Sequence, residues 1–163
     1  MSSAAAILRG ARLCALSLGL LPPLAQGLTL CSASSTGVTF GNYNLGNPAP
    51  ADVMGNVQVS CSLIAASSAP VAYDILLGSG GSSSYAARQA GIGPSRLQYN
   101  LYTSATHSAI WGDGTGGSAK VSDAYQLGQT TVVRNYAIYA RAPAGQNIPA
   151  GLYTDTISVI VNY

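Results

Sequence analysis

The stretch that decides the fold is Thr156-Ile157-Ser158-Val159-Ile160-Val161-Asn162-Tyr163, at the end of the sequence. Ile157, Val159 and Val161 alternate with other residues, which is the pattern of a strand with one buried face. This strand runs to the last residue, so we expect its outer edge to be uncovered. Long apolar edge strands are usually blunted by charge, proline or a bulge, and here only Asp155 precedes the run. A strand supplied from outside would cover this edge.

Weaker period-two runs recur along the chain, and amphipathic helical patterns do not. The further strands that we predict cover residues 28–30, 38–40, 57–61, 71–77, 97–101, 125–133 and 136–141. Stretches rich in glycine, proline and serine separate them, at 46–50, 78–84, 112–117 and 143–151, and these are typical of turns and loops. Seven or eight short strands joined in this way predict a single all-β sandwich.

The composition excludes several classes of protein. Hydrophobic residues make up 48% of the chain and charged residues only 7%, against roughly a quarter in an ordinary domain. The few basic residues are scattered, so we expect no nucleic-acid binding, which needs clustered Lys and Arg. Glutamate is absent and His107 is the only histidine. We therefore expect no metal, no cofactor and no enzymatic activity.

Residues 1–27 have the pattern of a cleavable secretory signal. Arg9 and Arg12 precede an apolar run at 13–21, two prolines end the run, and Ala25-Gln26-Gly27 provides small residues for cleavage. The run is too short to span a membrane. We expect cleavage after Gly27, export of residues 28–163 as one domain, and a mature chain without net charge.

Two cysteines remain after this cleavage, Cys31 and Cys61. In an oxidising compartment an even pair is expected to form a structural disulfide. Two separate buried thiols are the alternative reading of the same pair. A bridge that closes a loop of about 30 residues would stabilise the fold by roughly 3–4 kcal/mol.

Motifs spread over the whole exported part carry a resemblance to a known family. They are, in order, Cys31 with VTFGNY at 38–43, VQVSC at 57–61, Arg88, LQYNLY at 97–102, IWGDG at 110–114, YARAPAGQ at 139–146 and AGLYTDT at 150–156. This set closely resembles the spore coat protein U domain family, which includes the Csu-type pilins of archaic chaperone-usher systems. So many elements in register make the resemblance specific.

The resemblance implies an incomplete immunoglobulin-like β-sandwich that lacks its final strand and is completed by a donor strand. It implies that a periplasmic pilus chaperone lends this strand and that a neighbouring pilin subunit replaces it during assembly through an outer-membrane usher. By analogy the groove for the donor strand lies between the first and last strands. Its expected lining residues are Leu28, Leu30, Val38 and Phe40 on one side, with Ile157, Val159 and Val161 on the other.

The expected cleavage restricts the role within such a fibre. A donor segment needs roughly ten alternating residues at about 3.3 Å each, and cleavage after Gly27 leaves only Leu28, Thr29 and Leu30 before Cys31. The sequence therefore favours a minor or tip subunit that accepts a strand, serving surface attachment and biofilm formation after passage through the periplasm to the cell surface. An extracellular spore or cell coat protein and a self-contained lectin-like binding module are the alternatives.

Two other groups of polar residues favour structural roles over catalysis or ligand binding. His107 lies near Ser104, Ser108 and Asp113, but proximity within one loop is not the geometry of a catalytic triad. Arg88 and Arg141 lie at motif positions, where we expect them to bond loop carbonyls or to pair with Asp74, Asp113 or Asp155.

Overall fold

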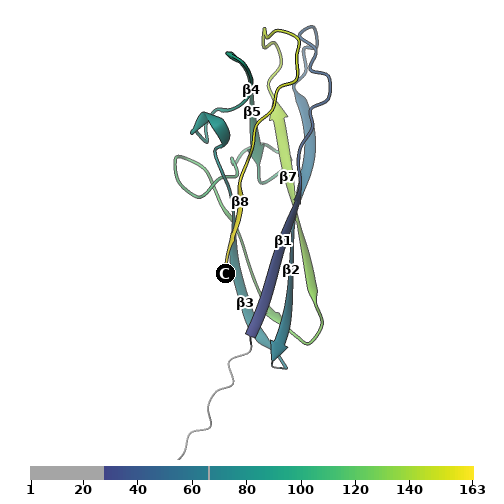
Figure 1. The fold of residues 1–163 in the computed structure, drawn as a ribbon, viewed down its shortest axis with the longest axis vertical. Helices are drawn as coiled ribbons and strands as arrows, with labels where there is room; N and C mark the ends of the chain where they lie inside the picture. Colours follow the sequence, from purple (N-terminus) through teal and green to yellow (C-terminus); the bar gives the residue numbers. More distant parts are fainter. Residues whose placement is uncertain (1–27, 66) are drawn as a thin grey trace, which may run out of the picture.

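The computed structural model describes residues 28–65 and 67–163, so the predicted signal at 1–27 lies outside the described residues. This part of the chain forms eight strands and one short 3-10 turn in an elongated molecule (Figure 1). The elements are β1 (Leu28–Thr36), β2 (Ala51–Ala65), β3 (Ala69–Leu77), η1 (Gly80–Ser82), β4 (Arg88–Ile92), β5 (Ser95–Tyr102), β6 (Val121–Leu127), β7 (Val132–Ala142) and β8 (Val159–Asn162). No helix among these residues is long and apolar enough to cross a membrane.

The strands form two antiparallel sheets. One has five strands in the order β1-β2-β7-β5-β4, and the other has three in the order β6-β3-β8. The longest pairing joins β2 to β7, from Ala51 opposite Ala142 to Cys61 opposite Val132. The prediction of an all-β fold is confirmed.

The core lies between the two sheets and follows from the period-two patterns. In β3 the odd-numbered residues from Ala69 to Leu77 are all buried, and the even-numbered residues face outward or are half-buried. β5 supplies Leu97, Tyr99 and Leu101 in the same way. Fully buried Trp111 lies between the sheets and donates its indole N–H to the carbonyl of Ile75, at 3.0 Å.

Three predicted strand boundaries are wrong, for reasons that alternation cannot reveal. Residues 38–40 alternate but pair with no strand. The run predicted at 125–133 contains the turn between β6 and β7. The last strand begins at Val159, because residues 156–158 form no ladder with β3.

One strand was missed. β4 begins with Arg88 at a position where an alternating apolar pattern would place a hydrophobic residue, on the same face as buried Ala90. Arg88 is nevertheless completely buried, so a cation occupies a core position where an apolar side chain is expected.

The predicted disulfide between Cys31 and Cys61 is confirmed. The two cysteines are direct partners in the register of β1 and β2. The bridge therefore fastens the edge strand β1 to the longest strand of the five-stranded sheet.

Candidate functional site: an apolar groove between two chain segments

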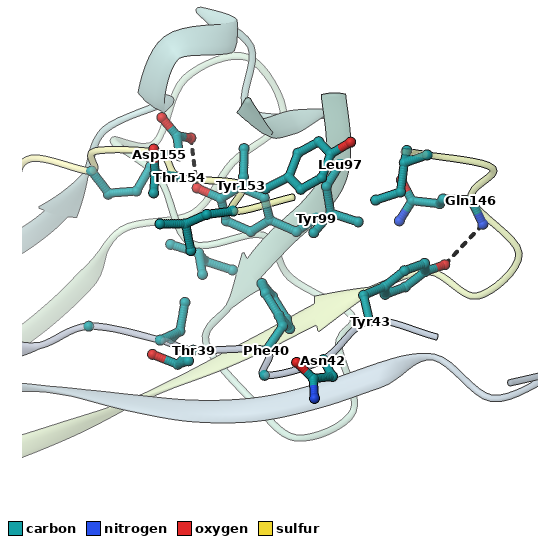
Figure 2. Close-up of a pocket in the computed structure, with 18 of the residues that line it drawn as sticks. Thr39, Phe40, Asn42, Tyr43, Leu97, Tyr99, Gln146, Tyr153, Thr154 and Asp155 are labelled. Carbon is teal, nitrogen blue, oxygen red and sulfur yellow. Dashed lines mark hydrogen bonds between the residues drawn. The ribbon is translucent and has the colours of Figure 1, made fainter. Parts of the chain in front are cut away.

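A groove with a volume of about 770 Å³ opens between two segments that are distant in the sequence (Figure 2). One wall, which we call the first wall, consists of residues 35–43 and Leu45; the second wall is formed from Gln146 and residues 148–155, with Ile157 and Val159. The floor between the walls is made of apolar side chains from the core: Leu77, Ala90, Leu97, Tyr99, Leu101 and Ile138. The two walls run in opposite directions along the groove, because the first wall continues from β1 and the second leads into β8 (Figure 1).

The structure brings four of the seven predicted groove residues together: Val38, Phe40, Ile157 and Val159. Leu28 and Leu30 lie outside the lining and are 60% and 56% exposed. Cys31 has to face buried Cys61, and residues two apart share a face of a strand, so Thr29 points inward and both leucines point outward. Val161 lies beyond the lining, opposite Ile75 in the ladder of β8 with β3.

The floor contains residues that the sequence pattern did not predict for the groove. Leu97, Tyr99 and Leu101 lie on one apolar face of the strand predicted at 97–101, and in the structure this face lines the groove. Alternation identifies a buried face but not what covers it. The family motif LQYNLY at 97–102 was the sequence signal that could have identified these residues as part of the groove.

The second wall is tied to both sheets. Thr154 exchanges two backbone hydrogen bonds with Gly91 of β4, at 2.9 and 3.3 Å. Further along, the carbonyl of Ser158 accepts a bond from the N–H of Gly78 next to β3, at 2.9 Å. This wall therefore passes from the edge of the five-stranded sheet to the edge of the three-stranded sheet.

β8 offers a free backbone edge to the groove. Among the described residues it pairs with β3 on one side only and is the last strand of its sheet. The Ser158 carbonyl points toward β3, and the backbone groups of successive residues in a strand point to opposite sides. The N–H and C=O groups of Val159 and Val161 therefore point away from β3, as a partner strand on the groove side requires.

The first wall also has unpaired backbone. Among the described residues, none from 37 to 43 makes a backbone–backbone hydrogen bond. The wall crosses closely over Gly55 of β2, where a Cβ atom would lie 2.8 Å from the Thr36 carbonyl and 2.9 Å from Val38. The ring of Phe40 packs edge-on against Tyr99 of the floor, with centroids 5.8 Å apart.

Tyr43 ties the far end of the first wall to the second wall. Its hydroxyl donates to the Pro143 carbonyl at 2.6 Å and accepts the N–H of Gln146 at 2.9 Å. Figure 2 shows Tyr43 and Gln146 pointing toward each other, well away from Asp155. The side-chain amide of Gln146 in turn bonds both the N–H and the C=O of Gln98 in β5, at 2.7 and 2.9 Å.

The buried cation Arg88 joins strands that supply the floor of the groove. The Arg88 guanidinium donates to the carbonyls of Gly78 and Trp111 and to the amide oxygen of Asn100, with distances of 2.7–3.0 Å. Burial lowers the pKa of Arg88, but an arginine of this kind stays charged. The expected bonding to loop carbonyls is what the structure shows, and it joins the ends of β3, β4 and β5.

Tyr99 connects the floor to the second wall. Its hydroxyl donates to the carboxylate of Asp155 at 2.7 Å, and the other oxygen of that carboxylate accepts the N–H of Gly81 at 2.9 Å. Burial raises the pKa of Tyr99, and the neighbouring Asp155 carboxylate raises it further. The hydroxyl is therefore a stable donor throughout the neutral pH range.

The second arginine, Arg141, forms an ion pair at the surface, but with none of the three aspartates that were expected. Arg141 binds Asp52 through two bonds of 2.6 Å, and this contact holds the pKa of Asp52 below its ordinary value. His107 Nε2 lies 3.8 Å from the same carboxylate. Ser104 and Ser108 instead bond to Thr106, so this loop does not assemble a Ser-His-Asp triad within the described residues.

Comparison with solved structures places the fold. A chain of the crystal structure of the CsuC–CsuE chaperone–tip adhesion subunit pre-assembly complex, from archaic chaperone-usher Csu pili of Acinetobacter baumannii, matches with a TM-score of 0.55 and 20% identity. The match covers 83% of the present chain and 40% of that chain. Together with the two antiparallel sheets, it confirms the predicted immunoglobulin-like β-sandwich.

Comparison with curated proteins finds no match. The model of the spore coat protein U domain matches residues 20–160, which include the groove walls, the disulfide and the buried arginine. On this match, and with the motifs in register along its strands, the chain belongs to the spore coat protein U domain family.

Proposed function

We propose that this protein is a subunit of a chaperone-usher pilus and that its groove accepts a β-strand from another protein. The observation that carries the proposal is an apolar groove flanked on both sides by unpaired backbone, that of β8 and that of residues 37–43. Backbone groups without partners are costly where water is excluded. An extended segment would satisfy both edges and cover the apolar floor at once.

The free energy available to such a segment is considerable. Each valine or leucine side chain that leaves water for the groove contributes about 1.5–3 kcal/mol. Only alternate residues of the segment point toward the floor. We therefore propose a donor with apolar residues at every second position.

We propose that three kinds of partner act in succession. A periplasmic pilus chaperone first supplies the strand, an outer-membrane usher receives the complex, and a neighbouring pilin subunit then replaces the chaperone. This sequence requires export by the predicted signal at 1–27, transit through the periplasm and a final place in a fimbrium at the cell surface. The solved complex of a chaperone with a tip adhesion subunit supports such a partner for a chain with this fold.

Within the fibre we propose a minor or tip position. Leu28, Thr29 and Leu30 pair with β2 of their own domain, in register with residues 62–65. If cleavage follows Gly27, these residues are committed to β1 and no segment remains to serve as a donor. N-terminal sequencing of the exported protein tests this point, and a mature chain starting near Ala11 would contradict it. Surface attachment and biofilm formation are the roles proposed for such a subunit.

A coat protein is the second candidate. The description of the matching family favours it, and a groove that accepts a strand suits assembly on a spore or cell surface equally well. Immunogold labelling of intact cells distinguishes the two, because thin fibres indicate a pilus and a continuous layer indicates a coat.

Co-expression with the periplasmic chaperone tests strand acceptance. We expect the protein produced alone to aggregate or to be degraded, and we expect a soluble one-to-one complex when the chaperone is present. A chaperone whose donor strand carries aspartate at its apolar positions is the matched control and should not rescue the protein. An isolated chain that is soluble, monomeric and cooperatively folded without any added strand would contradict the proposal and favour a self-contained binding module.

A further inference from the structure

The two walls of the groove are joined at one end by Tyr43 and Gln146. Tyr43 is the last but one of the lining residues along the first wall. Gln146 is the first lining residue along the second wall. Because the walls run in opposite directions, these two positions meet at the same end (Figure 2). The Tyr43 hydroxyl bonds the N–H of Gln146 and the Pro143 carbonyl, which closes the space between the walls at that end.

The closure is braced against the sheet. The Gln146 amide bonds both backbone groups of Gln98 as a neighbouring strand would, and its Nε2 also donates to the Pro143 carbonyl at 3.0 Å. β7 pairs with β5 only from Asn100 to Tyr102, so Gln146 occupies the stretch of β5 edge that β7 leaves open. Gln146 is thereby fixed to the five-stranded sheet.

The opposite end of the groove has no such connection. There the lining residues are Ser35 and Thr36 at the end of β1 and Val159 at the start of β8. Among the described residues, no hydrogen bond joins this part of β1 to β8. An extended segment can continue past this end but meets a bonded pair at the other.

We propose that Tyr43 and Gln146 form an end stop that limits how far an inserted strand extends and so selects its length and register. This inference rests on the proposed function, because it concerns the strand that the groove receives. The first wall from Ser35 to Tyr43 matches a strand of about nine residues at about 3.3 Å each. A longer strand must either bend away at Tyr43 or break the bonds between the walls.

A peptide series tests the end stop directly. The probes are synthetic peptides of alternating valine and threonine, from about five to about thirteen residues, extended at either end in separate series. They compete with the chaperone strand in the complex of the oxidised protein with its chaperone, and in the same complex of Tyr43→Phe, which keeps the ring and removes only the hydroxyl. Tyr153→Phe is the matched control, since its hydroxyl lies in the same groove and, among the described residues, bonds the Pro149 carbonyl within the second wall.

For the series that extends toward Tyr43, we expect the affinity of the unaltered protein to stop rising once the peptide reaches the stop. In Tyr43→Phe the next valine should add about tenfold, which corresponds to the burial of one such side chain. Gln146→Ala keeps the backbone N–H that bonds Tyr43 but loses the side-chain bonds to Gln98 that fix the stop to the sheet, so it should show the same change, and Tyr153→Phe should match the unaltered protein. A merely structural role of Tyr43 would instead lower the affinity for peptides of every length.

The outcomes separate the two proposals. If peptides bind and Tyr43→Phe reaches its plateau at the same length as the unaltered protein, the end stop is refuted and the strand-accepting groove stands. If Tyr43→Phe fails to fold, Gln146→Ala decides in the same way. If no peptide of any length binds the unaltered protein, the strand-accepting groove itself is refuted, and the end stop with it.

Discussion

At the scale of single residues, Arg88 is the most unusual feature of the molecule. It is completely buried, and within the described residues its hydrogen-bond partners are two carbonyls and one amide oxygen, without a carboxylate. A buried cation is tolerated only when its donors are satisfied. Arg88 therefore joins β3, β4 and β5, the strands that supply much of the groove floor, and no apolar side chain could replace its hydrogen bonds.

Replacing Arg88 should be far more damaging than replacing an exposed arginine. In Arg88→Met the carbonyls of Gly78 and Trp111 lose their buried donor, and each such loss costs about 1–3 kcal/mol. We expect the free energy of unfolding of the protein with a bound donor-strand peptide to fall by about 3 kcal/mol or more, as measured by urea denaturation at a fixed, saturating peptide concentration. Arg96→Met is the control, because Arg96 bonds only turn carbonyls at the surface, and a change within about 0.5 kcal/mol is expected. Equal losses in the two variants would refute the role of Arg88.

The raised pKa values of Tyr99 and Tyr136 predict how the free energy of unfolding depends on pH. Burial raises the pKa of Tyr99 and of Tyr136, and hydrogen bonds to Asp155 and Asp123 raise them further. Because the folded pKa lies above the unfolded value of about 10, the stabilisation is fully present below pH 10. It is lost as the pH rises through the folded pKa.

We therefore expect the ionisation of these tyrosines to leave the free energy of unfolding unchanged at neutral pH and to lower it above about pH 10. Ultraviolet absorbance of tyrosinate should show fewer groups ionising near pH 10 in the folded protein than in urea. Tyr99→Phe should reduce this difference. Identical titration curves for the folded and unfolded protein would contradict the expectation.

At the scale of elements, the disulfide matters because β1 is an edge strand. In the part of the chain that the structure describes, β1 is hydrogen-bonded to its sheet only through β2, and the bridge between Cys31 and Cys61 closes a loop with a sequence separation of 30. The first wall of the groove begins where β1 ends. Loss of the bridge should therefore loosen this wall as well as the strand.

Removing the disulfide should lower the free energy of unfolding by about 3–4 kcal/mol. The change is made with the paired variant Cys31→Ser and Cys61→Ser, and urea denaturation of the peptide-bound protein with and without reductant measures it. Reductant should shift the midpoint of the unaltered protein and leave that of the paired variant unchanged. A midpoint that does not respond to reductant in either protein would mean that the bridge does not stabilise the fold.

Alternation predicted the strands with one face in a core and failed elsewhere. In β3 the face from Val71 to Leu77 is buried as the pattern requires. Residues 38–40 have the same pattern but lack a neighbouring strand, so they form a groove wall instead. Alternation measures which face is apolar and does not report whether the backbone is paired. That difference is what makes this segment available to a partner.

At the scale of the whole molecule, the unpaired edges should be visible by hydrogen exchange. Immediately after release from the chaperone, while the groove is empty, we expect the amides of residues 37–43 and of Val159 and Val161 to exchange rapidly. A bound strand should protect them, because their N–H groups then gain partners. The amides of Val57 and Val59 are the internal control and should be slow in both states, since β2 pairs on both sides. Unchanged exchange at residues 37–43 on strand binding would mean that the strand binds elsewhere.

The sequence by itself determined the all-β class, the disulfide and the strands that face the core, because period-two patterns and cysteine pairing are local or compositional properties. Motifs in register along the chain also led to the family. Only the tertiary structure decided that Leu28 and Leu30 face outward, that Arg88 is buried, and that Tyr43 meets Gln146. These three facts depend on which distant segments lie side by side. Such contacts are set by sheet order and register, and no local pattern encodes them.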